Sequence, residues 1–499
     1  MFDAFVQLMA PSLLIITLAG VCLGIIWGAL PGLSTTMAMG LLIGMSAGMS
    51  QDLAICFMLG VYTGSVFGGA ISAVLINIPG TPDAVPTMIE GHQLAQRGEG
   101  GQALGMAIAA SFVGGMVGII LLIAFIPLLL TFALNFRSWE MFWLAVIGIM
   151  VSGSMAAGSM PLKGWIAGWL GILVALVGLD AIHAVPRFTF DSWNLYDGIS
   201  YIAVLIGLFG LAEIFRTLPS KNAPTIPSDV GRIVPPFKTL LRFAPSAVRS
   251  GVMGTLIGAI PGAGANVASF LAYDVGRRRA KPEEQAKWGK GSYEALVCCE
   301  TANNANIGGS MLPTLALGIP GNAAAAALLA ALTLKNVNVG PTIEIDQPGL
   351  IYFIYGALII ANFMMYLAAF ALIAPCVKLF SLPRGILMPL IIPVCVIGAY
   401  SVKLSMFDVW VMFASGVVGW LLTVFRFPVA PIVLGVILAP LADENLRRSL
   451  MVFEDQSLSA ILSNWIGTIL MGFVLFVVVE GVLRGLRSMR EEPAPSAAP

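Results

Sequence analysis

Apolar runs as long as a lipid bilayer is thick recur from one end of the chain to the other. They lie at 12–30, 104–134, 349–380, 405–424 and 459–483. Each run is near or above the roughly 20 residues that a helix needs to cross a bilayer core. Only 10% of the 499 residues are charged, whereas soluble domains carry about 25%. The sequence therefore predicts an all-α polytopic membrane protein.

Charge and motif content exclude several classes of function. The formal net charge is zero, which gives no basis for binding nucleic acid. The six cysteines and two histidines show no metal-ligand spacing. No nucleotide-binding phosphate loop, HExxH motif or nucleophile elbow is present, and "WGKGS" at 288–292 resembles only the end of a phosphate loop. We expect no enzymatic activity and no cofactor.

Two basic polar stretches divide the chain. The stretch 216–249 is rich in proline and basic residues, and 276–294 carries six basic residues. Both are predicted to be cytoplasmic by the positive-inside rule. The resulting organisation is a first membrane repeat at 1–215, a cytoplasmic linker at 216–249 and a second membrane repeat at 250–485. A disordered cytoplasmic tail is predicted at 486–499.

The segment 250–275 is too short to cross the membrane twice. It has 26 residues between two predicted cytoplasmic stretches, while two spans need about 40. Pro261 and Gly262 lie at its midpoint, where proline stops a helix and glycine turns the chain. We therefore predict a re-entrant hairpin. The alternative is a single tilted span with one of the two loops outside.

Two proline–glycine phrases occur twice in the same order. "GIIWGALPG" at 24–32 matches "GTLIGAIPG" at 254–262, and "VLINIPGTPDA" at 74–84 matches "LALGIPGNAAA" at 315–325. The loop between the paired phrases is strongly basic in the second half and has no basic residue in the first. Opposite loop charge at corresponding positions is typical of an inverted-topology repeat.

Small residues at four-residue spacing predict close helix packing in lipid. Gly24 and Gly28 form one such set, and Gly254 and Gly258 form its counterpart in the second half. Gly60, Gly64 and Gly68 form a third set.

The proline–glycine breaks are candidate substrate-binding elements. A helix that restarts after a break presents free backbone N–H groups and a positive dipole end, which together bind carboxylate or phosphate oxygens. The alternative is that each break is a bend with satisfied caps. The candidate substrate-binding residues are Pro31, Gly32, Ser34, Thr35, Thr36, Pro79, Gly80, Thr81, Pro261, Gly262, Gly264, Asn266, Pro320, Gly321 and Asn322.

Polar residues at membrane depth are candidates for a coupling ion, Na⁺ or H⁺. "CCETANNANIGGS" at 298–310 is the most polar sequence inside a run of spanning length. Ionisable groups at such depth are costly, and their default interpretation is functional. For Glu300 and Asp83 the alternative is a solvated position near a membrane surface. The coupling-ion candidates are Asn77, Asp83, Glu300, Asn303 and Asn304.

These motifs resemble a known family. "GALPGLSTT" at 28–36, "TGSVFGGAISAVLINIPGTPDAVPT" at 63–87 and "ANNANIGGSMLPTLALGIPG" at 302–321 are similar to the large membrane subunit of tripartite tricarboxylate transporters, the TctA family. The resemblance covers about residues 10–485. It implies about 11–12 membrane segments with broken or re-entrant helices, and it implies two inverted repeats.

The resemblance also implies partners and a mechanism. A TctA-like chain is expected in the bacterial inner membrane with a small TctB-like membrane subunit of about four spans and a periplasmic TctC-like binding protein. It would import citrate or a related di- or aromatic carboxylate, driven by an ion gradient. Two alternatives remain: a stand-alone ion-coupled symporter or exchanger, and a membrane scaffold or sensor that transports nothing.

Overall fold

The structure is a computed structural model in which residues 2–156, 160–217, 233, 237–380, 384–453 and 464–491 are described. In these residues almost all regular structure is helical, which confirms the predicted all-α class. The chain forms two compact units, described separately below. Unit 1 comprises Met1–Ala133 and Ile202–Trp420, and unit 2 comprises Leu134–Tyr201 and Leu421–Pro499.

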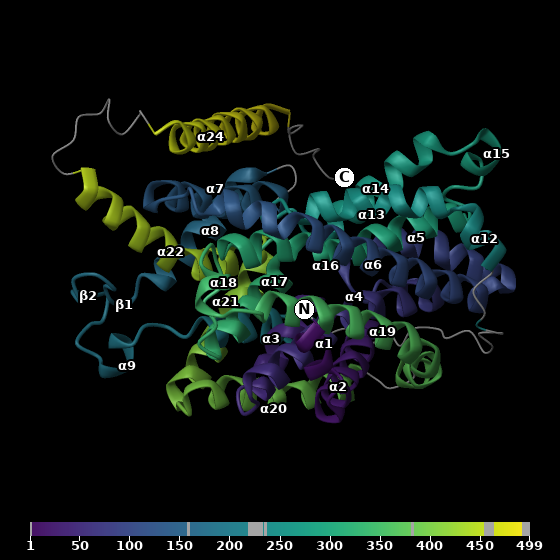
Figure 1. The fold of residues 1–499 in the computed structure, drawn as a ribbon, viewed down its shortest axis with the longest axis horizontal. Helices are drawn as coiled ribbons and strands as arrows, with labels where there is room; N and C mark the ends of the chain where they lie inside the picture. The colour runs from purple at the N-terminus through teal and green to yellow at the C-terminus, as the bar shows by residue number, and fades with distance from the viewer. Residues whose placement is uncertain are drawn as a thin grey trace, which may run out of the picture. The chain divides into compact units, whose positions relative to one another are not determined.

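Unit 1 contains most of the helices (Figure 1). Its first part consists of α1 (Phe2–Leu8), α2 (Pro11–Ala29), α3 (Thr35–Ser46), α4 (Gln51–Ile76), the 3₁₀ turn η1 (Pro82–Ala84), α5 (Val85–Leu94), the π-helical turn η2 (Ala95–Glu99) and α6 (Gly100–Ala133). Its second part consists of α10 (Tyr201–Leu205), the π-helical η3 (Ile206–Leu211), α11 (Ala212–Thr217), α12 (Phe237–Arg242), α13 (Ala244–Gly258), α14 (Gly264–Arg279), α15 (Pro282–Gln285), α16 (Tyr293–Leu317), α17 (Ala323–Leu334), α18 (Ile343–Asp346), α19 (Leu350–Phe380), α20 (Arg384–Lys403) and α21 (Met406–Val424).

Unit 2 is smaller and draws on the end of each half. Its elements are α7 (Ser138–Ala156), α8 (Pro161–Ala175), β1 (Gly178–Leu179), β2 (Pro186–Arg187), α9 (Trp193–Tyr196), α22 (Ala430–Phe453) and α24 (Trp465–Glu491). The strands β1 and β2 pair antiparallel, with Gly178 opposite Arg187. This short ribbon is a departure from a purely helical chain. The two units therefore cut across the sequential halves 1–215 and 250–485 predicted above.

Seven segments of the described chain are long and apolar enough to cross a membrane. They are Pro11–Ala29, Gln51–Ile76, Pro82–Ala133, Ser138–Ala156, Leu350–Phe380, Met406–Val424 and Trp465–Leu483. The expected 11–12 membrane segments do not appear as full-length helices. Four further apolar helices have only 10–17 residues, and α3 and α17 are short because a break precedes each of them. The 25-residue α16 falls below this hydropathy level because it carries two glutamates and three asparagines.

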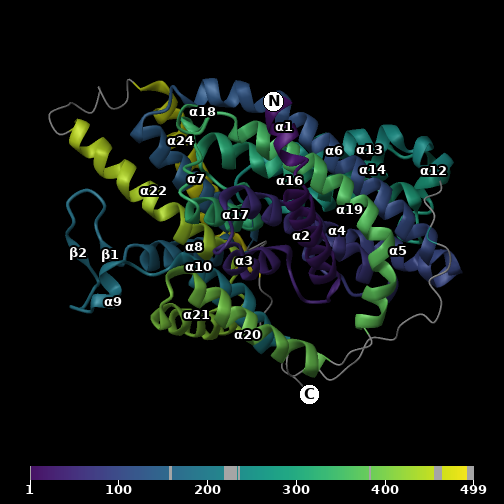
Figure 2. The same cartoon turned by 60° about the horizontal axis from the view of Figure 1, so that its bottom comes forward.

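Helices α4 and α16 form the centre of unit 1. The whole spanning window of α4 is buried, and α16 is buried almost throughout. Helix α2 packs along α4, whereas α13 and α6 pack along α16. Helix α19 lies beside α2 and α4, as both views show (Figures 1 and 2). Residues of α2, α4, α6, α16 and α19 share one apolar core.

The glycine sets bring these helices into backbone contact, as the sequence predicts. A Cβ added at Gly24 would lie 2.4 Å from the carbonyl oxygen of Val61. One added at Gly64 would lie 2.3 Å from the carbonyl oxygen of Val21. Contacts this short leave no room for any side chain, so glycine allows the two backbones to touch.

We expect Gly24→Ala to destabilise the protein by about 1–3 kcal/mol, because the new methyl group must push α2 away from α4. A thermal melt of the purified protein measures the effect. Gly48→Ala is the control, since a Cβ at Gly48 has no atom within 4 Å. Equal melting temperatures for the two variants would contradict the close contact.

Parts of the predicted linker and tail lie outside the described residues. Within the stretch 216–249, residues 218–232 and 234–236 are not described, and 237–249 contribute α12 and the start of α13. The tail residues 492–499 are also outside the described residues, and α24 extends to Glu491.

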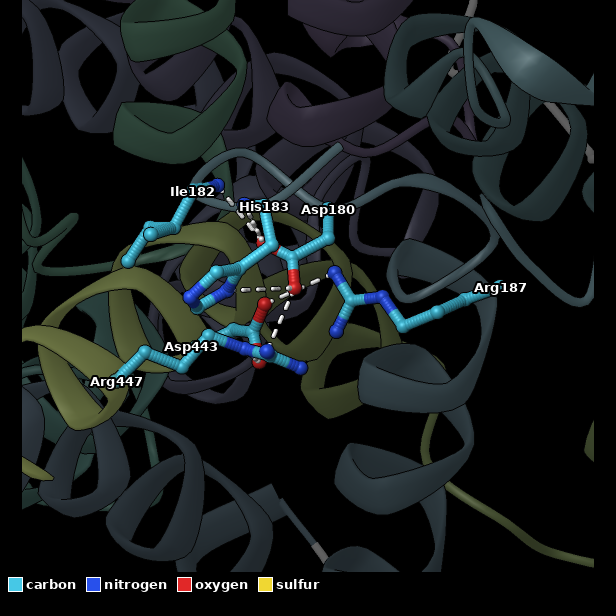
Figure 3. A network of polar contacts seen from close by, with 6 residues as sticks. All are labelled: Asp180, Ile182, His183, Arg187, Asp443 and Arg447. Atoms are coloured by element: carbon cyan, nitrogen blue, oxygen red, sulfur yellow. Dashed lines mark hydrogen bonds and ion pairs between the residues drawn. The ribbon is translucent and has the colours of Figure 1, made fainter. Parts of the chain in front are cut away.

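An ion network holds the β1–β2 ribbon of unit 2 against α22 (Figure 3). Arg447 donates to Asp180 at 2.6 Å and, through Nε, to Asp443 at 3.1 Å. Asp443 also accepts from Arg187 at 2.9 Å. Asp180 further accepts from the backbone N–H of Ile182 at 2.7 Å. The network joins residues around the ribbon to one face of α22.

The network predicts a pH dependence. The Ile182 N–H, and then the guanidinium groups of Arg447 and Arg187, hold the pKa of Asp180 below its usual value. A lowered folded-state pKa contributes stability above the unfolded value of about 3.9, and this stability is lost as pH falls through the folded value. We expect Asp180→Asn to melt at a lower temperature than the wild type at pH 6, and we expect the difference to shrink as pH falls below about 3.9. A difference of the same size at pH 6 and at pH 3 would show that the carboxylate charge is not responsible.

Candidate functional site

Each of the four proline–glycine pairs separates two helical elements, as predicted. Proline cannot continue a helix, and the following glycine turns the chain. Gly32 and Gly262 have φ angles of +92° and +82°. At each break one helical element ends and the next begins; the last and first residues are Ala29 and Thr35, Ile76 and Pro82, Gly258 and Gly264, and Leu317 and Ala323.

Two of the restarting helices are capped by a predicted residue. The Oγ of Ser34 accepts from the N–H of Met37 at 3.1 Å. The Oδ1 of Asn322 accepts from the N–H of Ala325 at 2.8 Å. The residues in the corresponding positions before η1 and α14, Thr81 and Ala263, make no such side-chain bond. The four breaks therefore differ in how many backbone donors remain available.

The two breaks of each half lie against each other. A Cβ added at Gly80 would lie 2.0 Å from the carbonyl oxygen of Gly28, and one at Gly321 would lie 2.5 Å from that of Gly258. In the second half the Gly262 N–H also donates to the Gly321 carbonyl at 2.8 Å. These contacts place the first and second break of each half side by side.

The contacts of the two halves follow one register. Gly24 faces the carbonyl of Val61, and Gly254 faces that of Ala302, 241 residues after Val61. Two further contacts repeat in the same way. Gly28 packs on Ser65 as Gly258 packs on Asn306, and Gly80 packs on Gly69 as Gly321 packs on Ser310. The contacted residues of α4 and α16 are again 241 positions apart. Helices α4 and α16 end in left-handed residues at matching positions, Asn77 and Gly318.

The breaks of one half meet those of the other around α4 and α16. Helix α17, after the fourth break, packs against α3, after the first, and α14, after the third, packs against η1, after the second. Both α4 and α16 contact α17 and η1, while α3 contacts α4 and α14 contacts α16. All four breaks therefore converge on one buried region of unit 1.

A closed hydrogen-bond network occupies one side of this region. The Tyr62 hydroxyl lies 3.0 Å from the Ser310 Oγ and donates to the Asn322 Oδ1 at 3.1 Å. The Asn322 Nδ2 lies 2.9 Å from the Tyr62 hydroxyl and 2.9 Å from the Asn306 Oδ1. The network joins α4 of the first half to the fourth break.

Glu300 occupies the other side, fully buried. Its carboxylate accepts from the Thr87 hydroxyl at 2.5 Å and from the Ser111 hydroxyl at 2.8 Å. The Asp83 carboxyl is close enough to interact with Glu300 electrostatically. Two carboxyl groups from different halves thus lie near each other in the protein interior.

Several buried polar atoms around Asp83 have no hydrogen-bond partner among the described residues. Asn303 lies on α16, which packs against the turn η1 that carries Asp83, and neither polar atom of its amide has a partner within hydrogen-bond distance. Buried polar groups are nearly always paired, so a cluster of unpaired ones points to a ligand. The unpartnered atoms of this region are Thr35 Oγ1, Ser72 Oγ, Thr81 Oγ1, Asp83 Oδ2, both polar atoms of Asn303 and Asn304 Oδ1.

The structure gathers some predicted site residues and separates others. Asp83, Glu300, Asn303 and Asn304 are buried on or beside α16. Asn77 is exposed at the end of α4 and lies outside this buried set. The predicted residues at the breaks lie at the four turns, where Thr35, Thr81 and Asn322 are buried. Asn266 is exposed in the first turn of α14, and Ser34 and Thr36 are half-buried.

Four residues of these hydrogen-bond networks were not predicted from sequence: Tyr62, Thr87, Ser111 and Ser310. Tyr62 did carry a usable signal, because a buried tyrosine normally needs a partner for its hydroxyl. In the described part of the chain, no group of three or more His, Cys, Asp or Glu could hold a metal ion. The arrangement instead offers two carboxylates together with neutral oxygen groups.

Discontinuous helices around a buried polar centre, in a chain with seven long apolar helices, define a multi-pass membrane protein of the transporter type. Residues 14–434 match the Tripartite tricarboxylate transporter TctA family. The chain belongs to this family, so it is the TctA membrane component of a tripartite tricarboxylate transporter and not an enzyme.

Two relatives in Agrobacterium vitis are similar to the chain. One is the uncharacterized 52.8 kDa protein in the TAR-I ttuC' 3'region, 33% identical over 492 residues, which are 98% of this chain and 97% of that protein. The other is the uncharacterized protein in the TAR-II ttuC' 3'region, 33% identical over 239 residues, which are 48% of this chain and 98% of that protein. No solved structure matches.

Proposed function

We propose that the chain is the permease of a binding-protein-dependent secondary transporter that imports small carboxylates. The transport site would lie where the four breaks converge in unit 1. The observation that carries the proposal is the set of unpartnered buried polar atoms in this region, above all those of Asp83 and Asn303. A scaffold or sensor has no use for unpaired polar groups at membrane depth, because each of them destabilises the fold.

The two halves are proposed to be structural repeats of inverted topology. The contacts that α2 makes on α4 recur in those that α13 makes on α16, with the contacted residues of α4 and α16 241 positions apart at each contact, which supports a repeat. The basic loop of the second half, which the first half lacks, supports the inversion. Inverted repeats would let the breaks enter from opposite faces, and 250–275 would then be a re-entrant hairpin.

The carboxylate is proposed to bind at the restarting helices. Thr35 at the start of α3 is buried, and its hydroxyl has no partner among the described residues, while the first turn of α14 has no side-chain cap. Such ends carry donors and a positive dipole, which bind carboxylate oxygens without a basic side chain. Citrate, a dicarboxylate or an aromatic carboxylate would satisfy this chemistry.

The coupling ion, Na⁺ or H⁺, is proposed to bind near Asp83, Glu300, Asn303 and Asn304. These side chains supply the buried carboxyl and amide oxygens of the region. Ionisable groups in a membrane interior are typical of ion pathways and proton relays. Binding of an ion here would add a charge next to the proposed carboxylate site, which gives a physical basis for coupling.

Family membership implies a tripartite assembly. We propose that the partners are a small membrane subunit of about four spans and a periplasmic binding protein, and that the complex lies in a bacterial inner membrane. The alternative is a stand-alone symporter or exchanger that shares the fold.

Uptake of labelled carboxylates into proteoliposomes tests the proposal. The vesicles would hold this chain with its small subunit, and the assay would be run with and without the binding protein and with and without a Na⁺ or H⁺ gradient. Uptake that requires both the binding protein and a gradient would support a tripartite, gradient-driven transporter. Uptake without the binding protein would favour the stand-alone transporter, and no uptake of any carboxylate would overturn the proposal.

A further inference from the structure

The register that relates the two halves also relates their polar centres. At the spacing of 241 residues, Tyr62 of α4 corresponds to Asn303 of α16, and Thr81 corresponds to Asn322. The side chains of Tyr62 and Asn303 each reach the break of the opposite half. Tyr62 bonds to Asn322, and Asn303 lies beside Asp83, two residues after Thr81. The two polar centres are thus counterparts that can be compared atom by atom.

The centre around Asn322 is complete within the protein. Both polar atoms of its amide are engaged, one with the Tyr62 hydroxyl and Asn306, the other with Tyr62 and the N–H of Ala325. The Tyr62 hydroxyl also meets the Ser310 Oγ at 3.0 Å. No donor or acceptor of Tyr62 or Asn322 remains for a ligand.

The centre around Asp83 is incomplete. Thr81 Oγ1, Asp83 Oδ2 and both polar atoms of Asn303 have no hydrogen-bond partner among the described residues, and Asp83, the most exposed of the three, is only 8% exposed. Three buried side chains from α16 and the second break therefore keep polar atoms without a partner. A small ligand with several coordination positions would satisfy these atoms.

Charge distinguishes the centres as well. The counterpart of Asp83 is Ala324, and the counterpart of Glu300 is Leu59. Both Ala324 and Leu59 are buried apolar residues, so neither counterpart position supplies a carboxylate to the centre around Asn322. At these paired positions the carboxylates therefore belong to the centre around Asp83.

We propose that the chain holds one monovalent cation site, formed by Asp83, Thr81 and Asn303, and that the Tyr62 hydroxyl permanently fills the counterpart position in the other half. The inference rests on the proposed ion-driven function and deepens it, because it narrows the ligand set and sets the number of such sites to one. Carboxylate, hydroxyl and amide oxygens are hard ligands, which suit Na⁺. Thr81 thereby becomes an ion ligand instead of a substrate ligand.

Equilibrium binding of ²²Na⁺ tests the proposal, with the full chain purified together with its small membrane subunit. The wild type is expected to saturate at about one Na⁺ per chain at this centre. Asn303→Tyr places the phenol of the opposite half into the site and is expected to weaken binding by at least about tenfold. Asp83→Asn keeps the side-chain shape and is expected to weaken binding by a similar factor, which covers the case that Asn303→Tyr does not fold.

Tyr62→Phe is the matched variant on the other side. It removes the hydroxyl from the closed centre, so a lower melting temperature with Na⁺ affinity within about twofold of the wild type is expected. The double variant Tyr62→Asn with Ala324→Asp rebuilds the open centre in the other half and is expected to raise the stoichiometry to two. Unchanged binding in Asp83→Asn, or two Na⁺ per chain in the wild type with both lost in Tyr62→Phe, would overturn the proposal.

Uptake measured on the same preparations separates this inference from the proposed function. Carboxylate uptake driven only by a H⁺ gradient, without measurable Na⁺ binding, would overturn the Na⁺ site and leave the proposed import intact. One Na⁺ per chain without uptake of any carboxylate would support the site and overturn the proposed import.

Discussion

Replacing Glu300 by glutamine is expected to reduce gradient-driven uptake by at least about 30-fold, the equivalent of about 2 kcal/mol. The Glu300 carboxylate is fully buried and accepts from two hydroxyl groups, those of Thr87 and Ser111. Glutamine has one acceptor oxygen, so its NH₂ group must face one of these hydroxyls. The substitution also removes the titratable carboxyl group that interacts with Asp83. The initial uptake rate in proteoliposomes at a fixed gradient measures the effect.

Glu294→Gln is a matched control on the same helix. Glu294 is 7% exposed and accepts from the Ser246 hydroxyl at 2.6 Å, which resembles the bonding of Glu300. Glu294 lies in the first turn of α16, before its most polar part, and among the described residues it does not interact with Asp83. Equal losses of uptake in both variants would show that α16 needs carboxylates for folding and that Glu300 has no specific role.

The helix breaks were predictable because their causes are local. Proline removes a backbone donor and the glycine that follows it permits a turn, so the two residues together favour the end of a helix at each of the four pairs. Glycines at four-residue spacing likewise predicted the contact between α2 and α4, because the spacing alone places them on one face.

The partners of the buried polar groups were not predictable from spacing. Thr87 and Ser111 reach Glu300 across 213 and 189 residues, and Tyr62 reaches Asn322 across 260. Such pairs depend on how α4, α6 and α16 cross, which no local pattern encodes. For the same reason the sequence suggested halves in chain order, whereas the structure combines the ends of both halves in unit 2.

The stretch "WGKGS" at 288–292 shows how a weak motif can have a structural explanation. Gly289 and Gly291 have φ angles of +80° and +98°, which turn successive N–H groups toward one point. The anion at that point is the carboxylate of Glu90, from α5 of the first half. The resemblance to a phosphate loop therefore reflects real anion-binding geometry, with a side chain of the same protein as the anion.

Replacing Glu90 by alanine is consequently expected to destabilise the protein by about 3 kcal/mol or more, because several donors lose a charged acceptor at once. Glu90 is fully buried and accepts four hydrogen bonds. The N–H groups of Gly289, Gly291 and Ser292 donate at 2.6, 3.0 and 2.8 Å, and the Tyr273 hydroxyl donates at 2.7 Å. Three of these donors are backbone groups that no other side chain replaces, so water or local unfolding must satisfy them.

Glu99→Ala provides the comparison that isolates this effect. Glu99 also joins the first half to the same loop, but it accepts from the Tyr293 hydroxyl alone, at 2.8 Å, and this hydroxyl also lies near Gln102. Removing the Glu99 carboxylate is expected to lower the free energy of unfolding by no more than about 1 kcal/mol. Thermal melts of the two variants, together with protease sensitivity of 276–294, measure the difference. Because the loop is anchored chiefly through Glu90, protease should cut it faster in Glu90→Ala and at the wild-type rate in Glu99→Ala. Similar melting temperatures and cutting rates would mean that the loop keeps its shape without the carboxylate.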